Sequence, residues 1–330
     1  MLTSRLSLIA AAVCLCIAPN APAQQASPAQ KPAVPAQKKT APAPKPGPVP
    51  TLSNIAYGTH ERQVMDFYQA KSDKPTPLVF FIHGGGWVAG DKTKVAGVPE
   101  YLAAGISVVA INYRYTSQAQ AAGVQPPVKA PLEDAARALQ FVRSKAKEWN
   151  IDPKRIGATG GSAGGASTCW LCTHDDLADP SSADPIARES TRLLCGAPVG
   201  AQTCFDPQLL REWLPNMSYG GHAYGFSKFQ DFYDGRDKVM HWVKEYSPYH
   251  LVTKDDSPMF LQYSLKNNEP PVLGKPAADP THSAVLGIKF AEKLKEAGVE
   301  YYLCYPGGPQ TPWTSATQFL IARLKGDLPK

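Results

Sequence analysis

Ser162 is the residue of this chain whose setting points most directly to covalent chemistry. It lies in the sequence Gly-Gly-Ser-Ala-Gly of residues 160–164, directly after the apolar run 155–159. A Gly-x-Ser-x-Gly sequence is typical of a sharp turn between a strand and a helix that exposes the serine hydroxyl as a nucleophile. Such a turn requires small neighbours, and the dipole of the helix behind it favours an anion. The sequence therefore predicts a nucleophilic serine at the start of a helix.

A second glycine-rich turn lies seventy-nine residues upstream, counted from His83 to Ser162. Its sequence is His-Gly-Gly-Gly-Trp, at residues 83–87, and it follows the apolar run 78–82. The backbone N–H groups of such a turn can hold the oxyanion that forms when a serine attacks an ester. Because both turns follow buried strands, we expect them to act together at one edge of a sheet.

The rest of the chain must supply that sheet, and apolar runs alternate with amphipathic segments after residue 51. We expect strands at 55–58, 64–70, 78–82, 106–113, 155–159, 193–200, 259–264 and 300–305, the first two as an antiparallel pair. We expect helices at 95–104, 132–149, 284–297 and 313–324, besides the helix after Ser162. This alternation predicts an α/β fold, with a mostly parallel eight-stranded sheet and helices on both of its faces.

Residues 205–250 interrupt the alternation with an excess of aromatic side chains. The eleven rings are those of Phe205, Trp213, Tyr219, Tyr224, Phe226, Phe229, Phe232, Tyr233, Trp242, Tyr246 and Tyr249. We expect a small cap here, inserted between two strands of the sheet. Its rings form either a lid or ligand-binding wall over the site, or a mini-core that holds the cap together.

Several motifs between residues 60 and 170 resemble the α/β-hydrolase fold, and within it the exported bacterial esterases of the acetylxylan/feruloyl esterase and hormone-sensitive-lipase-like groups. They are the two glycine turns, Gly-Asp-Lys at 90–92, Asn-Tyr-Arg at 112–114, Glu-Asp-Ala-Ala-Arg-Ala at 133–138 and Asp-Pro-Lys-Arg-Ile at 152–156. The resemblance implies ester hydrolysis through an acyl-enzyme on Ser162. It also implies that the N–H groups of Ala163, Gly84 and Gly85 donate to the oxyanion, where losing one such donor costs about 3 kcal/mol.

The chain departs from this family where the other two catalytic residues belong. A histidine usually follows the last strand, but Gln310 stands there and no histidine follows it. The acid usually follows the strand before it, where this chain has Asn267 and Asn268. A glutamine side chain has no proton to exchange near neutral pH and cannot act as a general base.

Two interpretations remain open. In the first, the chain is a degenerate hydrolase without turnover. In the second, the triad is rebuilt from the long loop 269–281, with His282 as the base and Asp279 or Glu269 as the acid that orients it. Against the second, an Asp before a Pro at a helix start is also the pattern of an ordinary N-cap, which would leave His282 as a first-turn residue of the helix at 284–297.

The N-terminal fifty residues differ in composition from the rest. Residues 1–23 have the apolar stretch and the Ala-Pro-Ala site of a secretory signal, and the Pro-, Ala- and Lys-rich residues 24–50 have the composition of a disordered tether. We therefore expect a secreted or periplasmic protein without stable membrane insertion. Of the 34 basic and 28 acidic residues, the first fifty hold five and none, so residues 51–330 are nearly neutral, which argues against a nucleic-acid partner.

Five cysteines follow the signal segment. Cys169 and Cys172 lie on the helix after Ser162, where we expect them to be buried, and Cys195 with Cys204 is a candidate disulfide. The fifth is Cys304. No metal or nucleotide motif is present, so no cofactor is expected.

Two functions fit these features. The first is an exported serine carboxylester hydrolase that acts on short acyl esters of small molecules or polysaccharides. The second is a catalytically dead, hydrolase-fold protein that binds a glycan or acyl ligand with its aromatic cap and vacant pocket.

Overall fold

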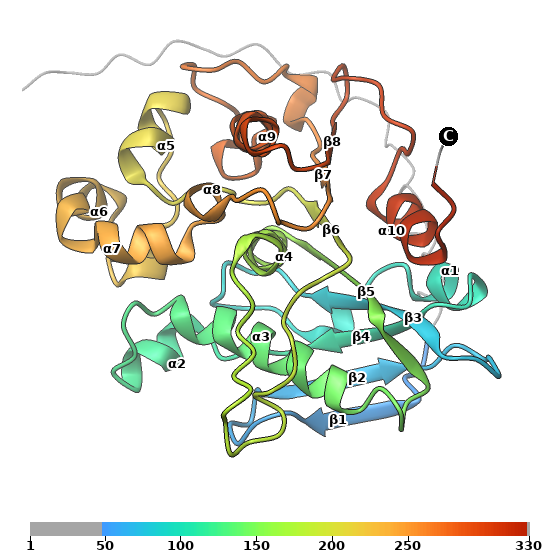
Figure 1. The fold of residues 1–330 in the computed structure, drawn as a ribbon. Coiled ribbons are helices and arrows are strands. Elements are labelled where there is room, and N and C mark those ends of the chain that lie inside the picture. Colours follow the sequence, from blue (N-terminus) through green and yellow to red (C-terminus); the bar gives the residue numbers. More distant parts are fainter. Residues whose placement is uncertain (1–47, 329–330) are drawn as a thin grey trace, which may run out of the picture. The chain divides into compact units, whose positions relative to one another are not determined.

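Eight strands form a single sheet in the order β1-β2-β4-β3-β5-β6-β7-β8 (Figure 1). The computed structural model describes residues 48–328, so the expected signal segment 1–23 and almost all of the expected tether 24–50 lie outside the described residues. The strands are β1 (Leu52–Ala56), β2 (Val64–Tyr68), β3 (Thr76–Ile82), β4 (Ser107–Ile111), β5 (Ile151–Gly161), β6 (Cys195–Val199), β7 (Met259–Gln262) and β8 (Tyr301–Cys304). Strands β3 to β8 are parallel, and β2 pairs antiparallel with β1 and with β4. The expected α/β architecture is confirmed.

Helices cover both faces of this sheet. They are α1 (Val98–Ala103), α2 (Thr116–Ala121), α3 (Lys129–Ser144), α4 (Ala163–Thr173), α5 (Pro207–Trp213), α6 (Phe229–Asp234), α7 (Arg236–Tyr246), α8 (Pro248–Leu251), α9 (Ala284–Ala297) and α10 (Ala316–Lys325). Helices α1 and α10 pack on one face, and α3, α4 and α9 lie on the other (Figure 1). Short 3₁₀ turns add η1 (Lys92–Lys94), η2 (Gly221–Tyr224), η3 (Lys266–Asn268) and η4 (Pro280–His282).

The observed bounds differ from the expected ones mainly at helix ends. The helix expected at 132–149 spans Lys129–Ser144, and the one expected at 313–324 begins at Ala316, because Ser315 caps it by accepting a hydrogen bond from the Gln318 N–H. Helix α2 was missed, since its polar and small residues carry no apolar periodicity. Side-chain capping is a local contact that hydrophobic periodicity does not report.

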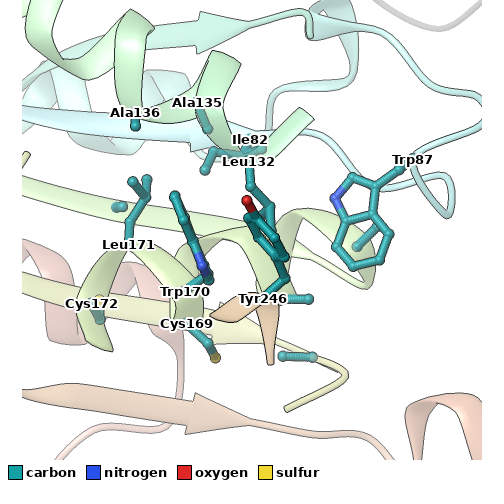
Figure 2. Packing of buried hydrophobic residues seen from close by; sticks show 14 of the residues in the cluster. Ile82, Trp87, Leu132, Ala135, Ala136, Cys169, Trp170, Leu171, Cys172 and Tyr246 are labelled. Carbon is teal, nitrogen blue, oxygen red and sulfur yellow. The ribbon is translucent and has the colours of Figure 1, made fainter. Parts of the chain in front are cut away.

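Helix α4 is the centre of the larger core. Its eleven residues are all buried, because β5, β6, α3 and α8 surround it. Figure 2 shows Trp170 of α4 beside Tyr246 of α7, and the two rings stack with their centroids 6.4 Å apart. The serine that precedes α4 is thus attached to a helix that has little freedom to move.

The candidate disulfide between Cys195 and Cys204 is wrong. Both residues are free thiols and fully buried, and burial raises the pKa of each thiol to about 12. Cys195 on β6 belongs to the core between the sheet and helices α1 and α10, whereas Cys204 belongs to the core on the other face. Cys169 and Cys172 are buried free thiols, as expected.

The turn that carries Ser162 depends on a close backbone approach. A Cβ atom on Gly164 would lie 2.1 Å from the carbonyl oxygen of Ile82 and 2.7 Å from that of His83. Only glycine therefore lets α4 begin this near the end of β3. A Cβ on Gly161, in the same turn, would meet nothing nearer than the Val199 oxygen at 4.0 Å.

Polar residues of the sequence motifs form buried hydrogen bonds and ion pairs with one another and with β2 and α3. Buried Lys92 forms an ion pair of 2.9 Å with buried Asp66 of β2, and its N–H donates to the Asn112 side chain. The Asn112 amide donates in turn to Asp91, over 2.8 Å. Arg114 forms an ion pair with the buried carboxylate of Asp134 on α3. The motifs at 90–92, 112–114 and 133–138 thus each contribute to these buried polar contacts.

His83 is a neutral side chain. Burial lowers its pKa to about 4. Its Nδ1 lies 2.7 Å from the Gly84 oxygen, its Nε2 lies 3.4 Å from an Arg62 nitrogen, and its ring stacks on Tyr113. Nδ1–H therefore donates to Gly84, and Nε2 accepts from Arg62, which the neutral tautomer alone permits.

We expect Gly164→Ala to destabilise the fold by about 3 kcal/mol, because the added methyl overlaps two backbone carbonyls that cannot rotate away. Gly161→Ala is the matched control, since it adds the same methyl to the same turn in open space. Thermal unfolding of both variants checks this. Equal melting temperatures for the two would contradict the close approach of α4 and β3.

We expect His83 to make the fold less stable as the pH falls from 6.5 to 4. The folded-state pKa lies below the unperturbed value of 6.5, so the unfolded chain binds the extra proton in that window, and stability present above pH 6.5 is lost toward pH 4. The loss amounts to about 3 kcal/mol at most. Urea unfolding of wild type and His83→Asn between pH 4 and 7.5 measures it, and identical pH profiles would contradict the assignment.

Candidate functional site

Ser162 lies at the point where β5 ends and α4 begins. Its backbone has a positive φ of 55° and a ψ of −124°, a conformation that non-glycine residues rarely adopt. Its N–H donates to the Val199 oxygen of β6 over 2.9 Å. The strained turn raises the hydroxyl above the carboxyl edge of the sheet, as the Gly-x-Ser-x-Gly sequence predicts.

His282 lies within hydrogen-bond distance of this hydroxyl. The distance between Ser162 Oγ and His282 Nε2 is 2.9 Å, and that between His282 Nδ1 and Asp279 Oδ2 is also 2.9 Å. A carboxylate accepts the proton on Nδ1, which leaves Nε2 free to accept the hydroxyl proton. The three side chains thus form a continuous hydroxyl–imidazole–carboxylate chain, the arrangement that activates a serine nucleophile.

Both partners of Ser162 come from the segment between β7 and α9. Asp279 Oδ1 accepts a 3.3 Å hydrogen bond from the His282 backbone N–H and caps η4, while its Oδ2 contacts the imidazole. Asp279 does not open the long helix, because α9 has its own N-cap, Ser283. One carboxylate oxygen of Asp279 therefore caps the turn, and the other contacts the imidazole.

The pKa of Asp279 lies below its ordinary value. Partial burial by itself raises the pKa, but the hydrogen bond from the His282 ring, the charge of that ring, the backbone N–H and the charge of Lys266 together lower it. The Asp279 side chain is 31% exposed and that of His282 is 40% exposed. Asp279 is therefore ionised at neutral pH, in a site that solvent reaches.

Gln310 and the two asparagines lie apart from this chain of hydrogen bonds. Gln310 lines a hollow beside Ile288 and Lys295 of α9, and that hollow contains neither Ser162 nor His282. Asn267 and Asn268 lie in η3, and within residues 48–328 neither forms a hydrogen bond to His282. The loop after β8 lies beside α9, and Gln310, Asn267 and Asn268 form none of the hydrogen bonds that join Ser162, His282 and Asp279.

The three N–H groups expected to hold an oxyanion belong to the two glycine-rich turns. Within the described part of the chain, those of Gly84, Gly85 and Ala163 have no hydrogen-bond acceptor. A Cβ on Gly84 would lie 2.6 Å from the Gly161 oxygen and 3.4 Å from Ser162 Cβ, so the two turns touch. Unpaired N–H groups in turns that touch at a hydroxyl can stabilise a negative oxygen that develops next to it.

A cavity of about 670 Å³ extends from Ser162 toward α1 and α10. Its apolar wall includes Phe81, Tyr101 and Val199, and its polar wall includes Gln262 and Thr317. No carboxylate lines it, and Lys94 lies at its rim. This lining suits a mostly apolar group with a few hydrogen-bonding atoms.

The aromatic excursion packs mainly on itself. None of its eleven rings is exposed. Tyr224 stacks on Phe232 with ring centroids 5.1 Å apart, and Phe205 packs against Trp87 of the upstream turn at 5.5 Å. His222 Nε2 lies 2.7 Å from the Gly86 oxygen, so this imidazole supports the turn. The rings thus form the mini-core of the cap.

The sequence analysis did not identify Gly200, which borders the His282 side chain. It has a positive φ of 54°, and a Cβ there would lie 3.7 Å from His282 Cδ2. Its position directly after β6, at the carboxyl edge of the sheet, was the available signal.

Residues 48–328 contain no group of three or more His, Cys, Asp or Glu side chains suited to a metal ion. No helix in this range is long and apolar enough to cross a bilayer.

Part of the chain matches a known protein family and known esterases. The BD-FAE family model matches residues 65–186. The chain is 28% identical over 75% of its length to a probable isoprenylcysteine alpha-carbonyl methylesterase of Arabidopsis thaliana, and 24% identical over 73% to a carboxylic ester hydrolase of Mycobacterium tuberculosis. These matches span 48% and 58% of the two relatives.

Two solved structures with the same fold are a bifunctional ester hydrolase and a carbohydrate esterase. An acetyl ester-xyloside bifunctional hydrolase from Caldicellulosiruptor lactoaceticus has a TM-score of 0.56 and 24% identity, over 80% of this chain and 85% of that one. A truncated carbohydrate esterase from gut microbiota has a TM-score of 0.60 and 20% identity, over 83% and 96%. The chain has the α/β-hydrolase fold and resembles esterases over part of its length.

Proposed function

We propose that this protein is a serine carboxylester hydrolase with a rebuilt catalytic triad of Ser162, His282 and Asp279. The observation that carries the proposal is the chain of two 2.9 Å hydrogen bonds from the Ser162 hydroxyl through the imidazole to the Asp279 carboxylate. In serine hydrolases such a chain removes the hydroxyl proton as the oxygen attacks.

Hydrolysis then follows in two steps. His282 Nε2 takes the proton of Ser162 Oγ while that oxygen bonds to the ester carbonyl carbon, and the carbonyl oxygen becomes an oxyanion held by the N–H groups of Ala163, Gly84 and Gly85. The imidazolium, held by Asp279, gives its proton to the departing alkoxide, and an acyl-enzyme remains. Water, deprotonated by His282, releases the acid and restores Ser162.

Short acyl esters, of small molecules or of polysaccharides, are the substrate class we propose. Two structural neighbours, an acetyl ester-xyloside hydrolase and a carbohydrate esterase, support this class, as does a cavity that has room for a small acyl or alcohol group. The signal-like residues 1–23 support secretion or a periplasmic location.

The alternative, a catalytically dead binding protein, fits the geometry less well. A pocket that only holds a glycan or acyl ligand has no need of a strained serine, three unpaired N–H donors and an oriented imidazole around one point. The aromatic residues of the cap, which that alternative assigned to ligand binding, pack mainly against one another.

We expect Ser162→Ala and His282→Ala each to lower kcat for p-nitrophenyl acetate by about 10⁴-fold or more, with similar losses, because triad members act as a unit. Asp279→Asn loses somewhat less. Gln310→Ala is the matched control and keeps wild-type kcat, because Gln310 lies outside the site. Near-wild-type turnover in His282→Ala would refute the rebuilt triad, and equal background rates in wild type and Ser162→Ala would favour the binding protein.

We also expect Thr317→Phe to narrow the cavity beside Ser162. The larger side chain at the start of α10 occupies space that a longer acyl group of the substrate needs. Each methylene that an apolar pocket excludes changes the ratio of kcat/KM between a long and a short substrate at least several-fold. The measurement is kcat/KM for p-nitrophenyl acetate, butyrate and hexanoate, with acetate as the internal control. An unchanged ratio between hexanoate and acetate would show that the acyl group does not enter this cavity.

A further inference from the structure

The turn that carries His282 is joined to the sheet by one buried side chain, Gln202. This residue is 2% exposed and lies three positions after the end of β6. Its Nε2 donates to the Thr281 oxygen over 2.9 Å and to the Gly200 oxygen over 3.3 Å. Thr281 is the residue directly before His282, so the amide holds the backbone from which the imidazole projects.

The orientation of the amide follows from its neighbours. Both contacts are carbonyl oxygens, which accept hydrogen bonds, so only the NH₂ group fits between them. Gln202 Oε1, on the other side of the amide, is buried without a hydrogen-bond partner in the described structure. A buried acceptor without a partner is unfavourable, so this orientation of the Gln202 amide lowers the stability of the fold while it holds the two carbonyls.

In the described part of the chain, Gln202 forms the one side-chain hydrogen bond to the backbone of the turn 279–282 from a distant residue. Within residues 48–328, the turn 279–282 is bonded to distant parts of the chain only by Gln202 and by the contact between His282 and Ser162 itself. Asp279 orients the ring relative to its own turn, because it caps that turn. It cannot set the distance between the turn and the serine.

The residues around Gln202 also hold the nucleophile. The Ser162 N–H donates to the Val199 oxygen, and the Gly200 N–H donates to the Gln262 oxygen over 2.7 Å. The segment 199–202 is therefore bonded at one end to the backbone of Ser162 and at the other to the turn of His282. It acts as a common reference from which both reacting groups are placed.

We propose that Gln202 is a positioning residue for the general base, which it keeps within reach of Ser162. The proposal rests on the proposed esterase activity. A base on the long segment between β7 and α9 needs such a support, because that segment is mostly exposed from Lys266 to Ala278. Without the amide, the imidazole spends less time within reach of the hydroxyl, and a displacement of about 1 Å is enough to cost roughly 100-fold in rate.

The test compares Gln202→Leu with Thr203→Val in the full chain. Thr203 is the adjacent residue, is fully buried, and donates from Oγ1 to the Leu286 oxygen of α9 over 2.8 Å. Its loss removes a hydrogen bond between the same segment and the same downstream part of the chain, but not the support of the turn. We expect kcat for p-nitrophenyl acetate to fall about 30- to 100-fold in Gln202→Leu with little change in KM, and less than 3-fold in Thr203→Val.

A second variant separates positioning from mere stability. In Gln202→Glu, an ionised carboxylate repels both carbonyls, whereas a protonated carboxyl can donate to one of them. The ratio of its kcat to the wild-type kcat should therefore rise as the pH falls from 8 to 5. A ratio that does not depend on pH, or equal losses of kcat in Gln202→Leu and Thr203→Val, would overturn the proposal.

NMR of the His282 ring distinguishes this failure from failure of the esterase proposal. We expect Gln202→Leu, and not Thr203→Val, to shift and broaden the ring resonances of His282. Ring signals that are unchanged in Gln202→Leu would refute the positioning role, whatever the turnover. Absence of Ser162-dependent turnover in wild type, with the ring signals perturbed as expected, would refute the esterase and retain the positioning role.

Discussion

The close contact between two glycine-rich turns is the constraint on which the rest of this structure depends. Gly164 lets the backbone of α4 come within van der Waals distance of the residues that end β3, and Gly84 lets the upstream turn lie against Ser162. Side chains at these positions would separate the hydroxyl from the N–H groups beside it. Within the upstream turn, neutral His83 donates to the Gly84 oxygen and stacks on Tyr113.

The proposed triad needs three side chains to meet at the carboxyl edge of the sheet. Asp279 and His282 are three residues apart, so a single 3₁₀ turn sets their mutual geometry. The remaining problem is the distance from that turn to Ser162. The β6 end solves it, because the Val199 oxygen and the Gln202 amide hold the serine and the turn from one short segment.

The aromatic cap contributes to the same problem from outside the site. Asn216 exchanges two hydrogen bonds with the Ala277 backbone, and the Gly274 N–H donates to the Trp213 oxygen, so the cap holds the loop that leads to Asp279. Its rings bury one another, which makes it rigid enough for this purpose. The open space beside Ser162 lies on the other side, between the strand ends and α10.

Local sequence by itself determined the α/β class, the positions of the strands along the chain and the two glycine-rich turns. Periodicity, glycine spacing and apolar runs are local signals. It also named His282 and Asp279 as candidates, but their pattern equally described a helix cap. Only the tertiary structure decided that the imidazole reaches Ser162, that Gln310 does not, and that Cys195 and Cys204 lie on opposite faces of the sheet. The physical reason is that these outcomes depend on how a long loop folds back across the sheet, which is set by contacts between residues far apart in sequence.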